Sequence, residues 1–104
     1  MENANVSTVW GNVQIPGDTT YNYIYQLATP GNFYGFSITS SDPYVCAVTI
    51  QMTGWETIEA GSGPTFSVTN NSSLPAIYNI VLLEVAPAGA VLASVDGGAQ
   101  LVQR

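Results

Sequence analysis

The sequence predicts an all-β protein, a two-sheet antiparallel sandwich that is jelly-roll-like and has about eight or nine short strands. The first reason is that apolar and polar residues alternate in short runs, without a sustained helical period. The second is that Pro, Gly, Asn, Asp and Ser separate these runs at regular intervals. The chain has 104 residues and shows neither a linker nor an internal repeat, so we expect one domain over residues 1–104.

Four strands are expected in the first half of the chain. Each is a run in which side chains alternate between two faces, and the runs are separated by turn signals rich in Pro, Gly, Asn and Asp. In the second run three tyrosines share one face. The predicted strands cover residues 9–15, 21–27, 34–38 and 44–52, and the first of them ends near Ile15.

The second half is expected to hold two hairpins on either side of one very apolar strand. That strand, residues 76–85, carries apolar side chains on both faces. A small sandwich covers only the inner face, so either the C-terminal segment or a neighbouring subunit must shield the outer one. The predicted hairpins pair residues 55–59 with 65–69 across a flexible loop at 60–64, and residues 90–95 with 99–103 across an Asp-Gly turn.

Cys46 is the only thiol, so it cannot close a disulfide within the chain. Its place in an alternating apolar run favours burial as a small hydrophobic side chain. A disulfide between two subunits is the alternative that the sequence leaves open.

Composition excludes most chemistry, because Arg104 is the only basic side chain and the chain has no lysine and no histidine. A net charge of −6 without a basic patch excludes nucleic acid and acidic membrane surfaces as partners. No apolar run approaches the roughly 20 residues of a membrane-spanning helix. Without an imidazole, a serine or Cys46 nucleophile lacks its base. The sequence also has no metal-ligand spacing and no phosphate loop, so we expect no enzyme, no metal and no cofactor.

The carboxylates offer no catalytic pair. Glu56 and Glu59 are three residues apart, so a strand sends them to opposite faces, which does not suit a glycosidase. Glu84 ends the apolar run, and the only side chain that can neutralise it is Arg104. We therefore expect contact between Glu84 and Arg104, either within one subunit or between two.

The aromatic residues suggest one alternative function, a lectin-like domain that binds carbohydrate. A surface rich in amides and poor in charge suits sugars, and exposed aromatic rings can stack on them. The competing interpretation is that the tyrosine stripe packs into a core or a subunit contact. The candidate sugar-stacking residues are Trp10, Trp55, Tyr21, Tyr23 and Tyr25.

Self-assembly is the function that the sequence favours. Soluble β proteins blunt their sheet edges with lysine, proline or bulges, and this chain has no lysine. A neighbour's edge is therefore expected to accept residues 3–9 or the tail, residues 101–103, as an added strand. The candidate contact residues are Asn3, Val6, Val9, Glu84, Leu101 and Arg104.

Such a chain is expected to be a structural subunit of an extracellular or cell-surface filament or layer, with itself as partner. Residues 1–7 have neither the basic nor the apolar region of a Sec-type signal, so the export route is open. A monomer kept soluble by its charge and its prolines is the competing interpretation, and a closed oligomer is a further one.

One hairpin carries a resemblance to a known family. The stretches Glu56-Thr57-Ile58, Gly61-Ser62-Gly63 and Phe66-Ser67-Val68 resemble a hairpin in bacterial endospore-appendage subunits, a family of jelly-roll proteins that polymerise by N-terminal strand insertion. The resemblance implies that residues 1–9 are the connector that inserts into a neighbour. Residues 1–15 contain no cysteine, so this chain departs from the family's covalently linked connector.

Overall fold

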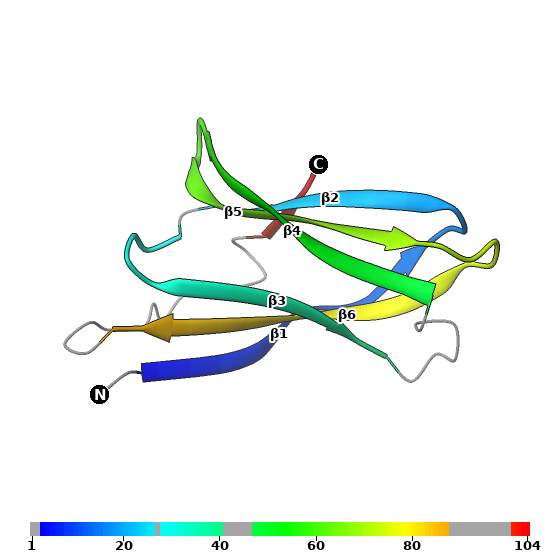
Figure 1. Cartoon of the computed structure of the whole chain (residues 1–104), viewed down its shortest axis with the longest axis horizontal. Helices are drawn as coiled ribbons and strands as arrows, with labels where there is room; N and C mark the ends of the chain where they lie inside the picture. Colours follow the sequence, from blue (N-terminus) through cyan, green and yellow to red (C-terminus); the bar gives the residue numbers. More distant parts are fainter. Residues whose placement is uncertain (1–2, 27, 41–46, 88–100) are drawn as a thin grey trace.

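The computed structural model describes residues 3–26, 28–40, 47–87 and 101–104, which fold into two antiparallel sheets packed face to face (Figure 1). All seven regular elements in these described residues are strands, so the predicted all-β sandwich is confirmed. The strands are β1 (Asn3–Ile15), β2 (Thr19–Tyr25), β3 (Phe33–Thr39), β4 (Val48–Ile58), β5 (Gly61–Asn70), β6 (Ala76–Ala86) and β7 (Leu101–Gln103).

Sheet A has the strand order β1-β6-β3, and sheet B has the order β4-β5-β2-β7. The chain passes from one sheet to the other after each strand except β4, which forms a hairpin with β5. Early strands therefore pair with late ones, β1 with β6 and β2 with β5, an order that is compatible with a jelly roll. Figure 1 views the sandwich from its side, with sheet B above sheet A and the β4-β5 hairpin rising at the upper left.

Alternation located the first three strands correctly. β3 spans residues 33–39 against a predicted 34–38, β2 spans residues 19–25 against a predicted 21–27, and β1 ends at Ile15 as expected. β1 begins at Asn3 rather than near Val9, because residues 3–8 pair with the end of β6. This pairing joins parts of the chain that are far apart in sequence, so the local alternation of residues 3–8 does not predict that they form a strand.

Two strands that were expected to be separate form one. Residues 48–58 are continuous as β4 through Gly54, next to a bulge between Met52 and Gly54 where the register with β5 shifts. The φ of Gly54 is 143°, which glycine adopts at little cost because it has no Cβ. This merger makes one strand of two that were predicted separately. The predicted strand at residues 90–95, Cys46 and the start of the 44–52 run lie outside the described residues.

The hairpin of β4 and β5 is confirmed, but the predicted loop at residues 60–64 is wrong. The two strands stay paired up to Ile58 opposite Gly61, so the turn is Glu59-Ala60 and residues 61–64 belong to β5. Close packing explains why a glycine stands within this strand. A Cβ on Gly63 would lie 1.6 Å from the carbonyl oxygen of Tyr25.

An aromatic stack joins the two sheets in the core. Phe66 of β5 lies 5.0 Å from the ring of Tyr23 of β2 and 4.3 Å from the ring of Phe36 of β3, measured between centroids. Tyr78 and Ile80 of β6 are fully buried in sheet A. The alternation of β2 and β3 thus supplies the side chains that hold the sandwich together.

Asn70 ties two segments together at one end of the sandwich. It is fully buried at the end of β5 and satisfies its polar atoms with the backbone. Its Oδ1 accepts a hydrogen bond of 3.0 Å from the N–H of Ser72. Its Nδ2 donates to the carbonyl oxygens of Ile15 (3.4 Å), Pro16 (3.2 Å) and Leu74 (2.8 Å). The end of β1 is therefore fastened to the loop that leads into β6.

Candidate assembly surfaces

The N-terminal half-strand, which we define as residues 3–8 of β1, is held to the domain mainly by its main chain. It pairs with residues 81–86 of β6 in one unbroken register. No side chain of residues 4–8 is buried, and Val6 is 65% exposed. At the other end of the same strand Ile15 is fully buried. The half-strand therefore extends the sheet without contributing to the core.

Two predicted contact residues, Asn3 and Val6, lie in this half-strand, and a third, Val9, follows it directly. Val9 is half-buried and packs against the core cluster. The boundary between the loosely held part of β1 and the part anchored by the core is thus near Val9. The connector that the sequence analysis expects, residues 1–9, ends at the same residue.

The outer face of sheet A is apolar, as the pattern of residues 76–85 predicts. Tyr78, Ile80 and Leu82 are buried, whereas the residues between them along β6 are only partly covered or exposed. We define the outer apolar face as the outward side chains at one end of this sheet: Ala4, Val6, Phe33, Val81, Leu83 and Val85.

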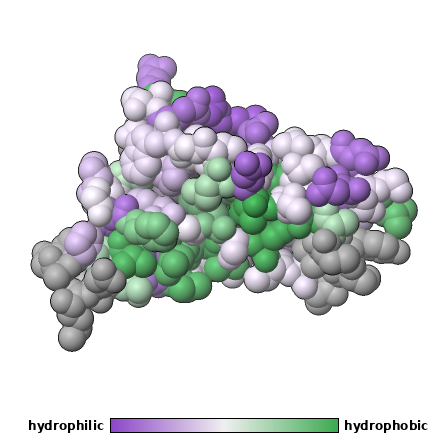
Figure 2. All heavy atoms as spheres, in the orientation of Figure 1, coloured by the Kyte–Doolittle hydropathy of each residue, from purple (hydrophilic) through white to green (hydrophobic). Residues whose placement is uncertain are grey.

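Exposure and charge set this outer apolar face apart from the rest of the surface. Phe33 is 63% exposed, and no member of the face carries a charge. Figure 2 shows apolar surface over the left part of β3 and β6, and further apolar surface near the middle of the view. A contiguous exposed apolar patch on a small domain is typical of an interaction surface.

Glu84 is buried, with 4% of its surface exposed, and it lies among neutral hydrogen-bond donors. Its Oε2 accepts hydrogen bonds from the hydroxyl of Tyr34 (2.9 Å) and from Nδ2 of Asn32 (3.0 Å). The Tyr34 hydroxyl in turn accepts a hydrogen bond of 2.8 Å from the N–H of Thr29. Glu84 therefore holds the connection between β2 and β3 against the sandwich, and its burial leaves it unsuited to contact another subunit.

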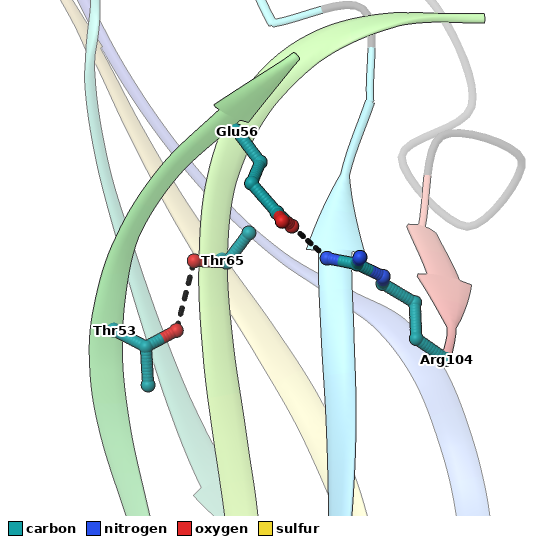
Figure 3. A network of polar contacts seen from close by, with 4 residues as sticks. All are labelled: Thr53, Glu56, Thr65 and Arg104. Atoms are coloured by element: carbon teal, nitrogen blue, oxygen red, sulfur yellow. Dashed lines mark hydrogen bonds and ion pairs between the residues drawn. The ribbon is translucent and has the colours of Figure 1, made fainter. Parts of the chain in front are cut away.

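Arg104 pairs with Glu56, so the predicted contact between Glu84 and Arg104 within one subunit is wrong. The two side chains of the observed pair are 43% and 45% exposed, and Figure 3 shows them reaching toward each other over sheet B. An ion pair this open to solvent contributes at most about 1 kcal/mol. A contact of Arg104 with another subunit stays a prediction.

A surface hollow of about 400 Å³ lies beside this ion pair. Next to the pair, the hydroxyls of Thr53 and Thr65 share a hydrogen bond of 2.8 Å. The hollow is lined by Asn22, Tyr23, Thr53, Glu56, Thr65, Phe66 and Arg104. The lining is a mixture of polar and aromatic side chains, and its two charged groups are paired with each other.

The C-terminal tail forms part of its own sheet. Leu101 is 3% exposed and stands opposite Tyr25, where β7 pairs with β2. Withdrawing residues 101–103 would remove a core side chain, so their use as a donor strand stays a prediction that this arrangement does not favour. The other predicted donor, at the N-terminus, has no buried side chain among residues 4–9.

The five-residue platform proposed for sugar stacking is also wrong. Tyr23 and Tyr25 are 1% and 4% exposed, so neither offers a ring face to a ligand. Trp10 and Tyr21 are partly buried against the core, and the Trp10 ring meets Tyr23 edge-on at 5.7 Å. Trp55 is the member that stays open, with 51% of its surface exposed. The stripe therefore packs into a core, which is the competing interpretation of the sequence.

Three buried tyrosines have perturbed acidities. Burial raises the pKa of Tyr23 and of Tyr34, because the phenolate form loses its solvent. Burial also raises the pKa of Tyr78, and the hydrogen bond with Tyr23 raises it further. All three are neutral hydrogen-bonding groups at neutral pH.

Within the described ranges, no group of three or more His, Cys, Asp and Glu side chains is placed to hold a metal ion. The same part of the chain contains no helix with the length and apolar character needed to cross a membrane.

Sequence reasoning missed the bulges of β1. The register with β6 shifts between Thr8 and Trp10 and again between Trp10 and Val13. Asn12 takes a φ of 55° there, and its N–H donates a 3.0 Å hydrogen bond to Oδ1 of Asn79. A Gly-Asn pair inside an alternating run is the signal that indicates such a bulge.

Comparisons with protein-family models, with curated proteins and with solved structures find no match to this chain. The assignment of a function therefore depends on the geometry of the chain itself.

Proposed function

We propose that this chain is a self-assembling structural subunit of an extracellular or cell-surface filament or layer, whose copies join by β-strand addition. The observation that carries the proposal is the N-terminal half-strand, which has no buried side chain among residues 4–8 and is attached through its pairing with β6. Moving such a strand to another molecule exchanges one set of backbone hydrogen bonds for another and leaves the core intact.

The outer apolar face supports the same proposal. Assembly would cover it, and water would be released from apolar side chains such as Phe33, Leu83 and Val85. Charge favours this face as well. Glu84 lies on the same strand but is turned inward, and Asp18, Glu56 and Glu59 lie outside the face, so none of the carboxylates in the described residues opposes the contact of two copies there. The resemblance to endospore-appendage subunits is consistent with this assignment.

The proposal gives the chain no catalytic role, no cofactor and no partner other than itself. Without histidine or lysine, the sequence lacks the side chains that most acid-base and nucleophilic mechanisms need near neutral pH.

Microscopy and sizing of the purified protein test the proposal. Negative-stain images at neutral pH should show filaments or layers, and sizing should show mass that grows with protein concentration. A monomer at every concentration would overturn the proposal. Deleting residues 1–7 should abolish the assemblies and leave a folded domain, judged by its circular dichroism. Assemblies that persist after the deletion would place the joining strand elsewhere in the chain.

Carbohydrate binding is the second candidate function. Of the five candidate stacking residues, Trp55 is the one that is exposed enough to bind a sugar. The indole is half-exposed on an edge strand of sheet B, where one face can stack on a sugar ring. A glycan panel measured with the native chain and with Trp55→Ala tests it. Binding that the substitution abolishes would support this candidate, and a panel without binding above background would remove it.

A further inference from the structure

We propose that the N-terminal half-strand of one copy pairs with β6 of a second copy, in the same register that it occupies within one chain. This inference rests on the proposed function. The bulged segment that follows, residues 9–12, is the hinge. This names both the acceptor edge, which is residues 81–86 of β6, and the place where the chain turns from one molecule to the next.

The hinge is a break in the ladder between two regular parts of β1. From Asn3 opposite Ala86 to Thr8 opposite Val81 the register is constant, and from Val13 onward it is constant again but displaced. Two residues more lie on the β1 side than on the β6 side between these parts, because the register shifts twice. A bulged segment can change direction without disturbing either ladder.

The two sides of the hinge differ in how firmly they are held. After it, Ile15 is fully buried and Val13 packs against the core cluster. Before it, the inward positions hold Asn5, which is exposed, and Ser7, which is half-buried. Detaching the half-strand therefore breaks main-chain hydrogen bonds but opens no cavity in the core.

Asn12 is the residue that holds the hinge in its present direction. Its φ of 55° lies in the left-handed region, which Asn tolerates better than most residues. The hydrogen bond from its N–H to Oδ1 of Asn79 ties the bulge to β6. Asn79 also donates a 3.2 Å hydrogen bond from Nδ2 to the carbonyl oxygen of Thr39, so the bulge is linked through one side chain to β3.

The register in the second copy is determined by which side chains meet. Val6 stands opposite Leu83 and Ala4 opposite Val85 on the outer apolar face, whereas Asn5 stands opposite Glu84 on the inner side. A slip by one residue would turn Asn5 outward and bring Val6 to the inner side. The same pairing in a second molecule restores both the hydrogen bonds and the apolar contacts.

Exchange of this kind gives an open chain when each copy donates to the next and receives from the one before. A reciprocal exchange between two copies closes a dimer instead. Because the proposed function requires growth, we infer the open, head-to-tail form.

Mixed cysteine variants test the acceptor edge. All are made in a Cys46→Ser background, which removes the native thiol. One protein carries Val6→Cys and the other Leu83→Cys, two positions that are directly opposite in the ladder and within the reach of a disulfide. After the two proteins are mixed, assembled and oxidised, we expect a covalent dimer that contains one chain of each kind, identified by its mass on non-reducing analysis.

A matched pair controls for random collision. Ser37→Cys and Val81→Cys are also opposite each other, but on β3 and β6, which do not exchange in this proposal. The mixture of these two proteins should give no covalent mixed dimer. Mixed dimers at equal yield in both mixtures would overturn the inference, as would their absence from the Val6→Cys and Leu83→Cys mixture when assemblies are present.

The double variant Val6→Cys, Leu83→Cys in one chain supplies the complementary measurement. Oxidised as a monomer, it locks the half-strand onto its own β6, and assembly should be lost and then restored by a reducing agent. Assembly that is unaffected by the lock would overturn the exchange but leave the proposed function standing. A chain that never assembles in any form overturns both, and a closed dimer with the expected cross-link supports the exchange but contradicts a filament.

Discussion

The hydroxyls of Tyr23 and Tyr78 hydrogen-bond to each other inside the core, and the bond joins the two sheets. Tyr23 belongs to β2 of sheet B and Tyr78 to β6 of sheet A, and both rings are almost completely removed from water. Burying a hydroxyl without a hydrogen-bond partner costs free energy. Each of these tyrosines supplies the partner that the buried hydroxyl of the other needs.

Replacing one of the two tyrosines should therefore be worse than replacing both. Tyr78→Phe leaves the Tyr23 hydroxyl buried without this partner, and we expect a loss of about 1–3 kcal/mol in the free energy of unfolding. The double variant Tyr23→Phe, Tyr78→Phe removes both polar groups and should lie closer to the native protein. Urea unfolding of the two single variants and the double variant measures this coupling. A double variant whose loss equals the sum of the single losses would show that the hydroxyls act independently.

Alkaline pH should destabilise the fold through the same side chains. The pKa values of Tyr23, Tyr34 and Tyr78 are raised in the folded state, mainly because burial disfavours the phenolate. Above about pH 10 the unfolded chain loses protons that the folded chain keeps, so the unfolded state binds fewer protons and the free energy of unfolding falls as pH rises.

This contribution to stability is complete below about pH 10 and declines by up to about 1.4 kcal/mol per pH unit for each tyrosine above it. Urea unfolding between pH 8 and pH 12, roughly the range around the ordinary tyrosine pKa, measures the slope. Tyrosinate absorbance from the buried rings should appear together with unfolding. Absorbance from all the tyrosines that develops near pH 10, while the chain stays folded, would contradict the prediction.

The alternation of apolar and polar residues predicted those strands that turn one face toward the core and the other toward solvent. β2 and β3 were predicted because Tyr23, Tyr25 and Phe36 recur at every second position and face the opposite sheet. The same rule failed for Ile24, which alternation assigns to the polar face of β2 but which is fully buried. The local alternation of β2 therefore does not determine which of its side chains are removed from water.

The assembly surfaces were predictable only in part. The outer apolar face follows from two apolar faces on one strand, and that signal is local to residues 76–85. The partner of Arg104 was missed because the pairing of β7 with β2, which brings residue 104 over sheet B, joins positions far apart in the sequence. The bulges of β1 were missed because a regular alternation was assumed across Gly11 and Asn12.

The glycine at residue 63 should be irreplaceable by alanine. A Cβ there would lie 1.6 Å from a backbone oxygen, that of Tyr25, and a backbone atom cannot turn aside as a flexible side chain can. We expect Gly63→Ala to lower the free energy of unfolding by about 3 kcal/mol or more. Gly35→Ala in β3 is the control, since its nearest neighbour would be a side-chain atom at 3.8 Å, and it should change stability by less than about 1 kcal/mol. Equal effects of the two substitutions in thermal unfolding would disprove this account of Gly63.

The burial of Glu84 makes a further prediction about stability. Glu84→Gln keeps an oxygen that can accept from Tyr34 and Asn32 and removes a buried charge, so we expect a change within about 1 kcal/mol or a gain. Glu84→Ala leaves both donors without their acceptor and should cost about 2–3 kcal/mol. Urea unfolding ranks the two variants. Equal losses for glutamine and alanine would mean that the charge itself is required.

A single lysine on the outer apolar face should block assembly without unfolding the subunit. Val85 is half-buried on the outward side of β6, so the ammonium of Val85→Lys reaches water in an isolated copy but would be buried without a partner between two copies. That burial costs at least about 3 kcal/mol, which corresponds to roughly a hundredfold rise in the concentration needed for assembly. Gln51→Lys on the exposed side of β4 adds the same charge to the other sheet and is the matched control. Light scattering against concentration should show the shift for Val85→Lys alone, and equal behaviour of the two variants would mean that the outer apolar face stays open in the assembly.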